Sequence, residues 1–291
     1  MSTRAEVVTP ALLRGWQVPR DAESKNDRGS ILVVGGARRT PGAAMLAGLA
    51  ALRAGAGRLT LAVAESTAVA TAVALPEAGV IGLPENAAGS VLGSDLSAAA
   101  DELGGADVVL VGPGLDDAGQ TAALLRSLAS AIGGDTLVVL DAYALGVLPG
   151  LEDLYPQWAG RLLLTPNPAE AQRLLAGKAA AGKDLSAAAV AIARRYAAVV
   201  SVQGAVADAD GGIWQVPAGS AGLGTSGSGD VLVGAAGGLL ARGAAPAQAA
   251  CWATYAHATA GDRLGASVGP LNYLARELLD ELPRVLAELT A

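Results

Sequence analysis

Short apolar runs alternate with longer stretches rich in alanine and leucine along most of the chain. The apolar runs contain many β-branched residues and few charges, a pattern typical of strands buried on both faces. They predict strands at 31–34, 58–63, 107–111, 136–140, 161–164 and 198–202, with helices between them at 43–54, 118–131, 168–176 and 185–196. Because strand and helix alternate, we expect right-handed crossovers and a mostly parallel sheet covered by helices on both faces.

The last third of the chain has a different pattern. Residues 205–216 predict two short strands around Asp210, Gly211 and Gly212, which is typical of a hairpin. Three helices are expected at 230–242, 247–264 and 272–289, with Pro283 kinking or splitting the last one. No linker or repeat divides the sequence, so we predict one α/β domain over residues 1–291, in which 1–25 form a candidate N-terminal arm.

Composition narrows the class of protein. Hydrophobic residues make up 52% of the 291 positions and charged residues 16%, which indicates a folded chain with a sizeable core. The net charge of −7 argues against a nucleic-acid partner or an anionic membrane surface. One cysteine and one histidine exclude a disulfide framework and a Cys/His zinc site, and we assign no residue as a metal ligand. No signal-peptide or membrane-spanning pattern is evident, so we expect a cytoplasmic protein.

The richest candidate for chemistry is the glycine loop SAGLGTSGSGDVLVG at 220–234, which enters a predicted helix. A glycine loop at a helix start offers unpaired backbone N–H groups and the positive end of the helix dipole, and both favour an anion. We expect Asp230, in the first turn, to cap the helix while also facing the ligand in the anion pocket. The alternative interpretation is a plain helix start with Asp230 as the N-cap.

Two nearby segments mimic phosphate-binding motifs, and we reject both. Gly222, Gly224 and Gly227 match GxGxxG but follow a hairpin, with no acidic residue about 20 positions on. The segment GKAAAGKD at 177–184 resembles a Walker A loop, but Asp184 stands where Ser or Thr must contact Mg²⁺.

Polar and glycine-rich turns follow several of the predicted strands. These turns contain Gly35, Gly36 and Gly42, then Gly112 and Gly114, then Asp141, then Asn167 and Glu170. Packing alone could explain the glycines, and a favourable helix-dipole interaction could explain Glu170. However, the carboxyl ends of parallel strands share one edge, where small molecules and nucleotides bind. Lysine is scarce there, so we expect backbone N–H groups and Mg²⁺ to hold phosphate, with Lys25, Arg38 and Arg39 as nearby cations.

The single histidine and the single cysteine lie on one predicted helix. Cys251 and His257 are six positions apart, which is not a same-face spacing for a shared metal. We predict that Cys251 is an inert core residue. For His257 the favoured interpretation is a packed, hydrogen-bonded side chain, and the alternative is support of a functional residue.

The ordered motifs resemble one known family. The segments that carry the resemblance are KNDRGSILVVGGARRTPGAAMLAGLAALRAGAGRLTLAV, VGPGL, LDAYAL, LTPNPAEAQRLL, GSGDVLVGAAGGLLARG and AHATAGD. Together they span about residues 25–265 and look like the ADP/ATP-dependent (S)-NAD(P)H-hydrate dehydratases of the ribokinase-like superfamily, in the form without a fused epimerase domain. The resemblance implies a three-layer αβα sandwich with a mostly parallel central sheet. It also implies repair of hydrated NADH or NADPH with ADP or ATP as co-substrate and Mg²⁺ as cofactor.

The resemblance also implies roles for individual residues. Asp230 would take the proton of the ring hydroxyl, which is phosphorylated before phosphate is eliminated. The anion hole would be formed by Gly227, Ser228 and Gly229. The nucleotide would lie along Gln203, Gly204, Ala205, Val206 and Ala207 and contact Gly229, whereas Ala43, Gly114, Asn167 and Asp230 would line the hydrate site. A cytoplasmic homotetramer is expected on the same basis.

Three positions depart from the family pattern. Asn167 replaces the histidine of the family's TPHPGE, Tyr143 replaces the second acid of LDADAL, and Gln203 replaces a lysine. Two alternatives therefore stay open beside the dehydratase: a ribokinase-like kinase of the hydroxyethylthiazole or sugar type, and an inactive nucleotide-binding homologue.

Overall fold

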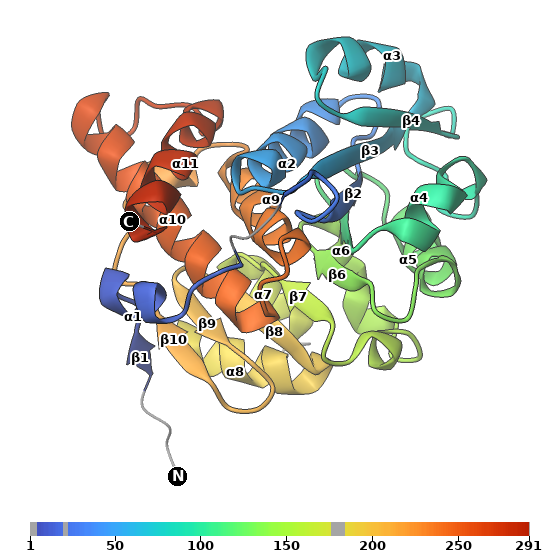
Figure 1. Ribbon diagram of the computed structural model, residues 1–291. Helices are drawn as coiled ribbons and strands as arrows, with labels where there is room; N and C mark the ends of the chain where they lie inside the picture. Colours follow the sequence, from blue (N-terminus) through green and yellow to red (C-terminus); the bar gives the residue numbers. More distant parts are fainter. Residues whose placement is uncertain (1–4, 20–22, 176–183, 291) are drawn as a thin grey trace.

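A central sheet of ten strands organises the computed structural model, which describes residues 5–19, 23–175 and 184–290 (Figure 1). The strands are β1 (Glu6–Val7), β2 (Ser30–Val34), β3 (Arg58–Ala64), β4 (Gly79–Leu83), β5 (Val108–Val111), β6 (Leu137–Leu140), β7 (Leu162–Leu164), β8 (Ala198–Val202), β9 (Ala205–Ala207) and β10 (Ile213–Gln215). Their order is β1-β10-β9-β8-β7-β6-β5-β2-β3-β4. All neighbours are parallel except β8–β9 and β9–β10, which are antiparallel.

Eleven α-helices are present in the described residues. They are α1 (Pro10–Gly15), α2 (Pro41–Arg53), α3 (Glu65–Ala74), α4 (Ala100–Gly105), α5 (Ala118–Ala131), α6 (Tyr143–Val147), α7 (Pro168–Leu174), α8 (Leu185–Tyr196), α9 (Ser228–Ala241), α10 (Pro246–Ser267) and α11 (Ala275–Thr290). One hydrophobic core joins one face of the sheet to α2, α9, α10 and α11, and a second joins the other face to α4–α8. The expected three layers are therefore confirmed.

The apolar side chains of strand β2 pack in both hydrophobic cores. Ile31 and Val33 pack in the first core, whereas Leu32 and Val34 pack in the second. Successive side chains of a strand point to opposite faces, so a strand between two helical layers must be apolar at every position. All six predicted strands of this kind are present. The predicted hairpin is also present, as β9 and β10.

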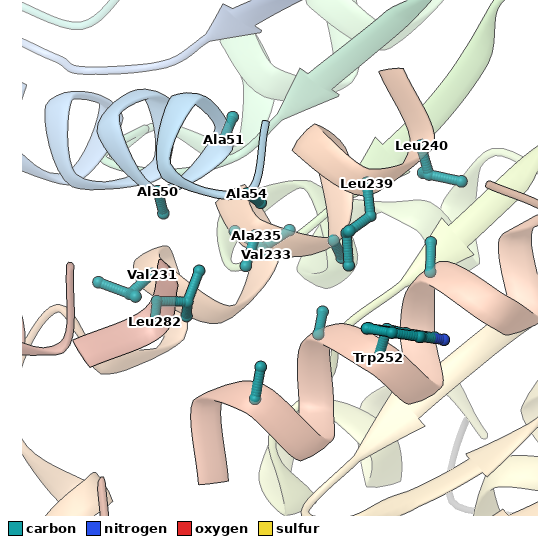
Figure 2. Close-up of a cluster of buried hydrophobic side chains, with 14 of the residues drawn as sticks. Ala50, Ala51, Ala54, Val231, Val233, Ala235, Leu239, Leu240, Trp252 and Leu282 are labelled. Atoms are coloured by element: carbon teal, nitrogen blue, oxygen red, sulfur yellow. The ribbon is translucent and has the colours of Figure 1, made fainter. Parts of the chain in front are cut away.

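Helices α2 and α9 pack unusually closely within the first core. A Cβ atom on Gly234 would lie 2.0 Å from the carbonyl oxygen of Ala47, and one on Gly238 would lie 2.3 Å from that of Ala51. Both pairs have the same sequence offset, so the two helices run parallel and in register. Figure 2 shows this part of the core, including Ala51 on α2 and Trp252 on α10. The amino ends of α2 and α9 are thereby placed side by side.

Residues 5–19 of the candidate N-terminal arm pack against the rest of the domain. Strand β1 pairs with β10. Trp252 donates its indole N–H to the carbonyl oxygen of Trp16 at 2.8 Å, and Gln248 donates to the carbonyl oxygens of Trp16 and Gln17. Residues 5–19 therefore add a strand to the sheet and pack against α10.

The expectation that Pro283 splits the last helix is wrong. Helix α11 runs without interruption from Ala275 to Thr290. Its buried side chains all lie on one stripe against the first core: Leu278, Leu279, Leu282, Val285, Leu286 and Leu289. This packing outweighs the loss of one backbone hydrogen bond at proline.

Candidate functional site

The turns after β2 and β5 interlock at the carboxyl edge of the sheet. Gly36 N–H donates to the carbonyl oxygen of Pro113, and Ala37 N–H and Thr40 Oγ1 donate to that of Gly114, all at 2.7–2.8 Å. Gly114 has φ of +75°, and a Cβ there would lie 2.3 Å from the Thr40 carbonyl oxygen. Backbone packing therefore explains Gly36 and Gly114, and only glycine fits at Gly114.

Asp141 lies at the end of β6 and is buried, with 7% of its surface exposed. Thr165 Oγ1, at the end of β7, donates a hydrogen bond to Asp141 Oδ1 at 2.8 Å. Burial raises the pKa of Asp141 to about 8, and the negative charges of Glu170 and Asp230 add to the effect. The following residue, Ala142, has φ of +48°, a strained conformation for alanine. The structure thus brings acids from β6, α7 and α9 close enough to interact.

Asn167 and Glu170 form a capping box at the start of α7. Asn167 Oδ1 accepts hydrogen bonds from the N–H groups of Ala169 and Glu170, and Glu170 Oε2 accepts one from Asn167 N–H at 2.8 Å. Burial raises the pKa of Glu170. The amide of Asn167 therefore holds α7, which accounts for this residue type at the position. The sequence motif N-x-x-E could have revealed this box.

The first turn of α9 has the properties expected of an anion site. Gly227 is the N-cap with φ of +91°, and it offers no side-chain cap. A Cβ on Gly229 would meet no atom within 4 Å, so this face of the turn is open. Within the described residues, the N–H groups of Gly229 and Asp230 have no hydrogen-bond acceptor. The turn can therefore bind an anionic ligand through its backbone.

Asp230 is half-buried in this turn. Burial raises its pKa to about 6. Asp230 does not cap α9, because the N-cap is Gly227 and Asp230 lies inside the helix. The alternative interpretation of Asp230 as the N-cap is therefore wrong. A carboxylate with a raised pKa at an anion-binding turn is suited to accept a proton.

Ser228 points into the protein instead of toward the open side of the turn. It is buried, and its Oγ lies 3.0 Å from Nε2 of His257, which also lies 2.9 Å from the Ser228 carbonyl oxygen. Ser228 N–H makes a bond to the Thr225 carbonyl oxygen at 3.2 Å. Cys251 is buried, and burial raises the pKa of its thiol, as expected of an inert core residue.

The segment 203–207 is divided between a turn and a strand. Gln203 and Gly204, with φ of +41° and +83°, join β8 to β9 in a two-residue hairpin turn at the carboxyl edge. Ala205, Val206 and Ala207 are buried and pair with both β8 and β10. Only the turn is therefore placed among the other loops at this edge.

The three candidate cations do not share one role. Arg38 forms an ion pair with Glu85 and donates a hydrogen bond to Ser66. Lys25 packs its backbone against Gly57, next to the amino end of β3, so it lies away from the carboxyl edge. Arg39 is exposed. The expectation that Lys25 lies near the first turn is therefore wrong.

The rejected motifs do not form phosphate loops of the expected kind. Gly222 and Gly224 belong to a 3-10 helix, Ala221–Gly224, so no strand leads into the GxGxxG match. Residues 177–183 of the Walker-like segment lie outside the described residues. Among the described residues, no group of three His, Cys, Asp or Glu side chains could hold a metal ion. No helix in that part of the chain is long and apolar enough to cross a membrane.

Comparison with known proteins identifies the family of the chain. The model of the NAD(P)H-hydrate dehydratase family matches residues 31–284. The chain is 41% identical to an ADP-dependent (S)-NAD(P)H-hydrate dehydratase of Xanthomonas campestris, over 98% of both chains. It also matches bifunctional NAD(P)H-hydrate repair enzymes, of whose length it spans about half.

Solved structures confirm the fold. A dehydratase of Bacillus subtilis co-crystallised with ATP and Mg²⁺ is 28% identical, with a TM-score of 0.80 over 99% of both chains. A ribokinase-like superfamily protein of Enterococcus faecalis is 22% identical, with a TM-score of 0.83 over 98% of this chain and 96% of that one. The ribokinase-like αβα architecture is thus established, and the chain belongs to the NAD(P)H-hydrate dehydratase family.

Proposed function

We propose that this protein dehydrates the S epimer of hydrated NADH or NADPH, with ADP or ATP consumed in the reaction. The observation that carries the proposal is the first turn of α9, where two unpaired N–H groups lie beside a half-buried carboxylate. This combination suits phosphoryl transfer to a hydroxyl, because the turn binds phosphate and the carboxylate accepts the hydroxyl proton.

The proposed reaction has two steps. Asp230 takes the proton of the ring hydroxyl as the hydroxyl oxygen attacks the terminal phosphorus of the nucleotide, and the bond from that phosphorus to the bridging oxygen of the nucleotide breaks. ADP then becomes AMP, or ATP becomes ADP. In the second step the ring C–O bond breaks, the adjacent carbon loses a proton, and inorganic phosphate leaves. The double bond that forms restores the reduced nicotinamide.

The backbone of Gly229 and Asp230 would hold the transferred phosphate. Ser228 would anchor the turn, because its N–H bonds to the Thr225 carbonyl oxygen and its hydroxyl faces His257. Gly227 contributes its conformation, because its φ of +91° starts the turn. Mg²⁺ would neutralise phosphate oxygens when bound. The nucleotide phosphates would supply most of the oxygen ligands of that ion.

The hydrate would bind between the ends of α2, β5, α7 and α9. The register that pairs Ala47 with Gly234 and Ala51 with Gly238, continued by one turn, puts Ala43 level with Asp230. We infer that Ala43, Gly114 and Asn167 line this space. Gly42 on α2 meets no atom within 4 Å of a Cβ position, so the backbone is accessible there.

The nucleotide would lie along the hairpin turn of Gln203 and Gly204. Ala205, Val206 and Ala207 would support that turn from inside the sheet. Gln203 carries no charge, so we expect phosphate binding to depend on the α9 backbone and Mg²⁺.

Product analysis tests the proposal. Purified protein is incubated with NADH hydrates, Mg²⁺ and ADP, and AMP, phosphate and NADH are quantified. The dehydratase predicts equal amounts of all three. A stable phosphorylated product with no release of phosphate would instead indicate the ribokinase-like kinase. ADP binding without any product would indicate an inactive homologue.

A cytoplasmic location and a homotetramer remain predictions.

A further inference from the structure

His257 is the single histidine of the chain, and it lies behind the proposed anion site. Its side chain extends from α10, and 6% of its surface is exposed. Nε2 lies 2.9 Å from the carbonyl oxygen of Ser228 and 3.0 Å from Ser228 Oγ. The histidine therefore contacts the first residue of α9 from the buried side of the turn.

The chemistry of this contact fixes the proton on Nε2. A carbonyl oxygen only accepts hydrogen bonds, so Nε2 must carry the proton that it donates to Ser228. Burial lowers the pKa of the imidazole to about 4, so the ring is neutral near pH 7. A neutral ring attracts phosphate less than a cation would. The contribution of His257 to phosphate binding therefore comes from holding Ser228 in place, not from a charge on the ring.

The amino end of α9 needs such a contact, because the usual cap is missing. Gly227 has no side chain to accept a bond from the first turn, and Ser228 turns its hydroxyl inward. In the part of the chain that the structure describes, the N–H groups of Gly229 and Asp230 are also unpaired. The turn is thus held by Val231 N–H to the Gly227 carbonyl at 3.2 Å, Ser228 N–H to the Thr225 carbonyl at 3.2 Å, and His257.

We propose that His257 is a positioning residue for the anion-binding turn. Its Nε2–H bond to Ser228 holds the first turn of α9 so that the N–H groups of Gly229 and Asp230 are directed together toward the terminal phosphate of the nucleotide. This inference rests on the proposed function, because it assigns the ligand of the turn as a nucleotide phosphate.

The unique histidine allows a direct test on the wild-type protein. Selective ¹⁵N-histidine labelling gives the ring signals of one residue, and ADP with Mg²⁺ is titrated in. We expect the Nε2–H resonance to shift with the same saturation curve as nucleotide binding measured by calorimetry. An unchanged resonance at saturating ADP would overturn the proposal.

Variants separate positioning from general stability. We expect His257→Leu to raise the KM for ADP at least 10-fold, with a smaller change in the KM for the hydrate, and His257→Gln to restore most of the loss by supplying a donor near Nε2. The matched control is Thr254→Val, which removes a buried hydrogen bond from α10 to Ser201, at 2.8 Å, instead of one to α9. This control should leave the KM for ADP unchanged.

The outcomes distinguish this inference from the proposed function. A folded His257→Leu variant with wild-type KM values would overturn the positioning role while leaving the dehydratase intact. If His257→Leu does not fold, the labelled wild-type protein decides the question. Absence of ADP binding to the wild type would contradict both proposals.

Discussion

Burial determines the chemistry available to Asp230. Its pKa of about 6 lies well above the ordinary value of an aspartate, because the half-buried carboxylate is poorly hydrated. A base must be ionised, so we expect activity to rise with pH and reach half its maximum near pH 6. Rates measured from pH 5 to 8 check this, and a flat profile would contradict the assignment.

Removal of the carboxylate gives a second test of Asp230. Asp230→Asn keeps the shape of the turn but cannot accept the hydroxyl proton. We expect a normal thermal unfolding curve, ADP binding close to that of wild type and a fall in kcat of about 100-fold or more. Retained turnover would remove Asp230 from the base role.

Asp141 shows the cost of burying an acid. Its pKa of about 8 in the folded protein means that it keeps a proton that the unfolded chain releases above about pH 4. Stability from this group therefore falls as pH rises between those values. We expect Asp141→Asn, which can still accept a bond from Thr165, to raise the free energy of unfolding at pH 7.5 by about 1–3 kcal/mol. Urea denaturation at pH 5 and 7.5 measures this, and the gain should shrink at pH 5.

Close packing of α2 on α9 aligns the amino ends of both helices at the site. Gly234→Ala would place a methyl group against the carbonyl of Ala47, so we expect it to lower the free energy of unfolding by about 1–3 kcal/mol. Gly146→Ala on α6 is the matched control, since no atom lies within 4 Å of its Cβ position. That control should be neutral or stabilising. Thermal unfolding compares them, and equal effects would contradict the packing argument.

The sequence pattern predicts the strands that are buried on both faces. The last four residues of strand β2 are all apolar, because the strand lies between two helical layers. Strand β4 and helix α3 lie at one edge of the sheet and were not predicted, since β4 is mostly half-exposed and contains two glycines. Helix α3 exposes Val69 and Val73, so its apolar residues do not mark a buried face.

The candidate site could be predicted only in part for a similar reason. Turns after parallel strands share an edge, so the grouping of Asp141 and Glu170 follows from topology. Asp230 joins them through the packing of α9 on α2, since a 3-10 helix and not a strand precedes its loop. The bond between His257 and Ser228 joins residues 29 positions apart on different helices, and no local pattern encodes it. The N-x-x-E motif is the local signal for the capping role of Asn167. From the sequence, we interpret Asn167 only as a departure from the histidine of the family pattern.

In the whole molecule, the turns that follow the parallel strands lie at one edge of the sheet, and helix α3 lies at its side (Figure 1). Val69 and Val73 are each 79% exposed on α3. Exposed apolar residues grouped on one helix are typical of contact surfaces. We expect light scattering to give four times the 28.5 kDa chain mass, and a mass near 28.5 kDa would contradict the homotetramer.

The activity that we propose for this fold is restoration of hydrated nicotinamide cofactor, with consumption of a nucleotide. The most direct measurement follows the absorbance of reduced nicotinamide while purified protein acts on a mixture of NADH hydrates with Mg²⁺ and ADP. Parallel samples omit the nucleotide or replace ADP with ATP. We predict nucleotide-dependent recovery that stops when the S epimer is exhausted. No recovery, with ADP binding still detectable by calorimetry, would contradict the account.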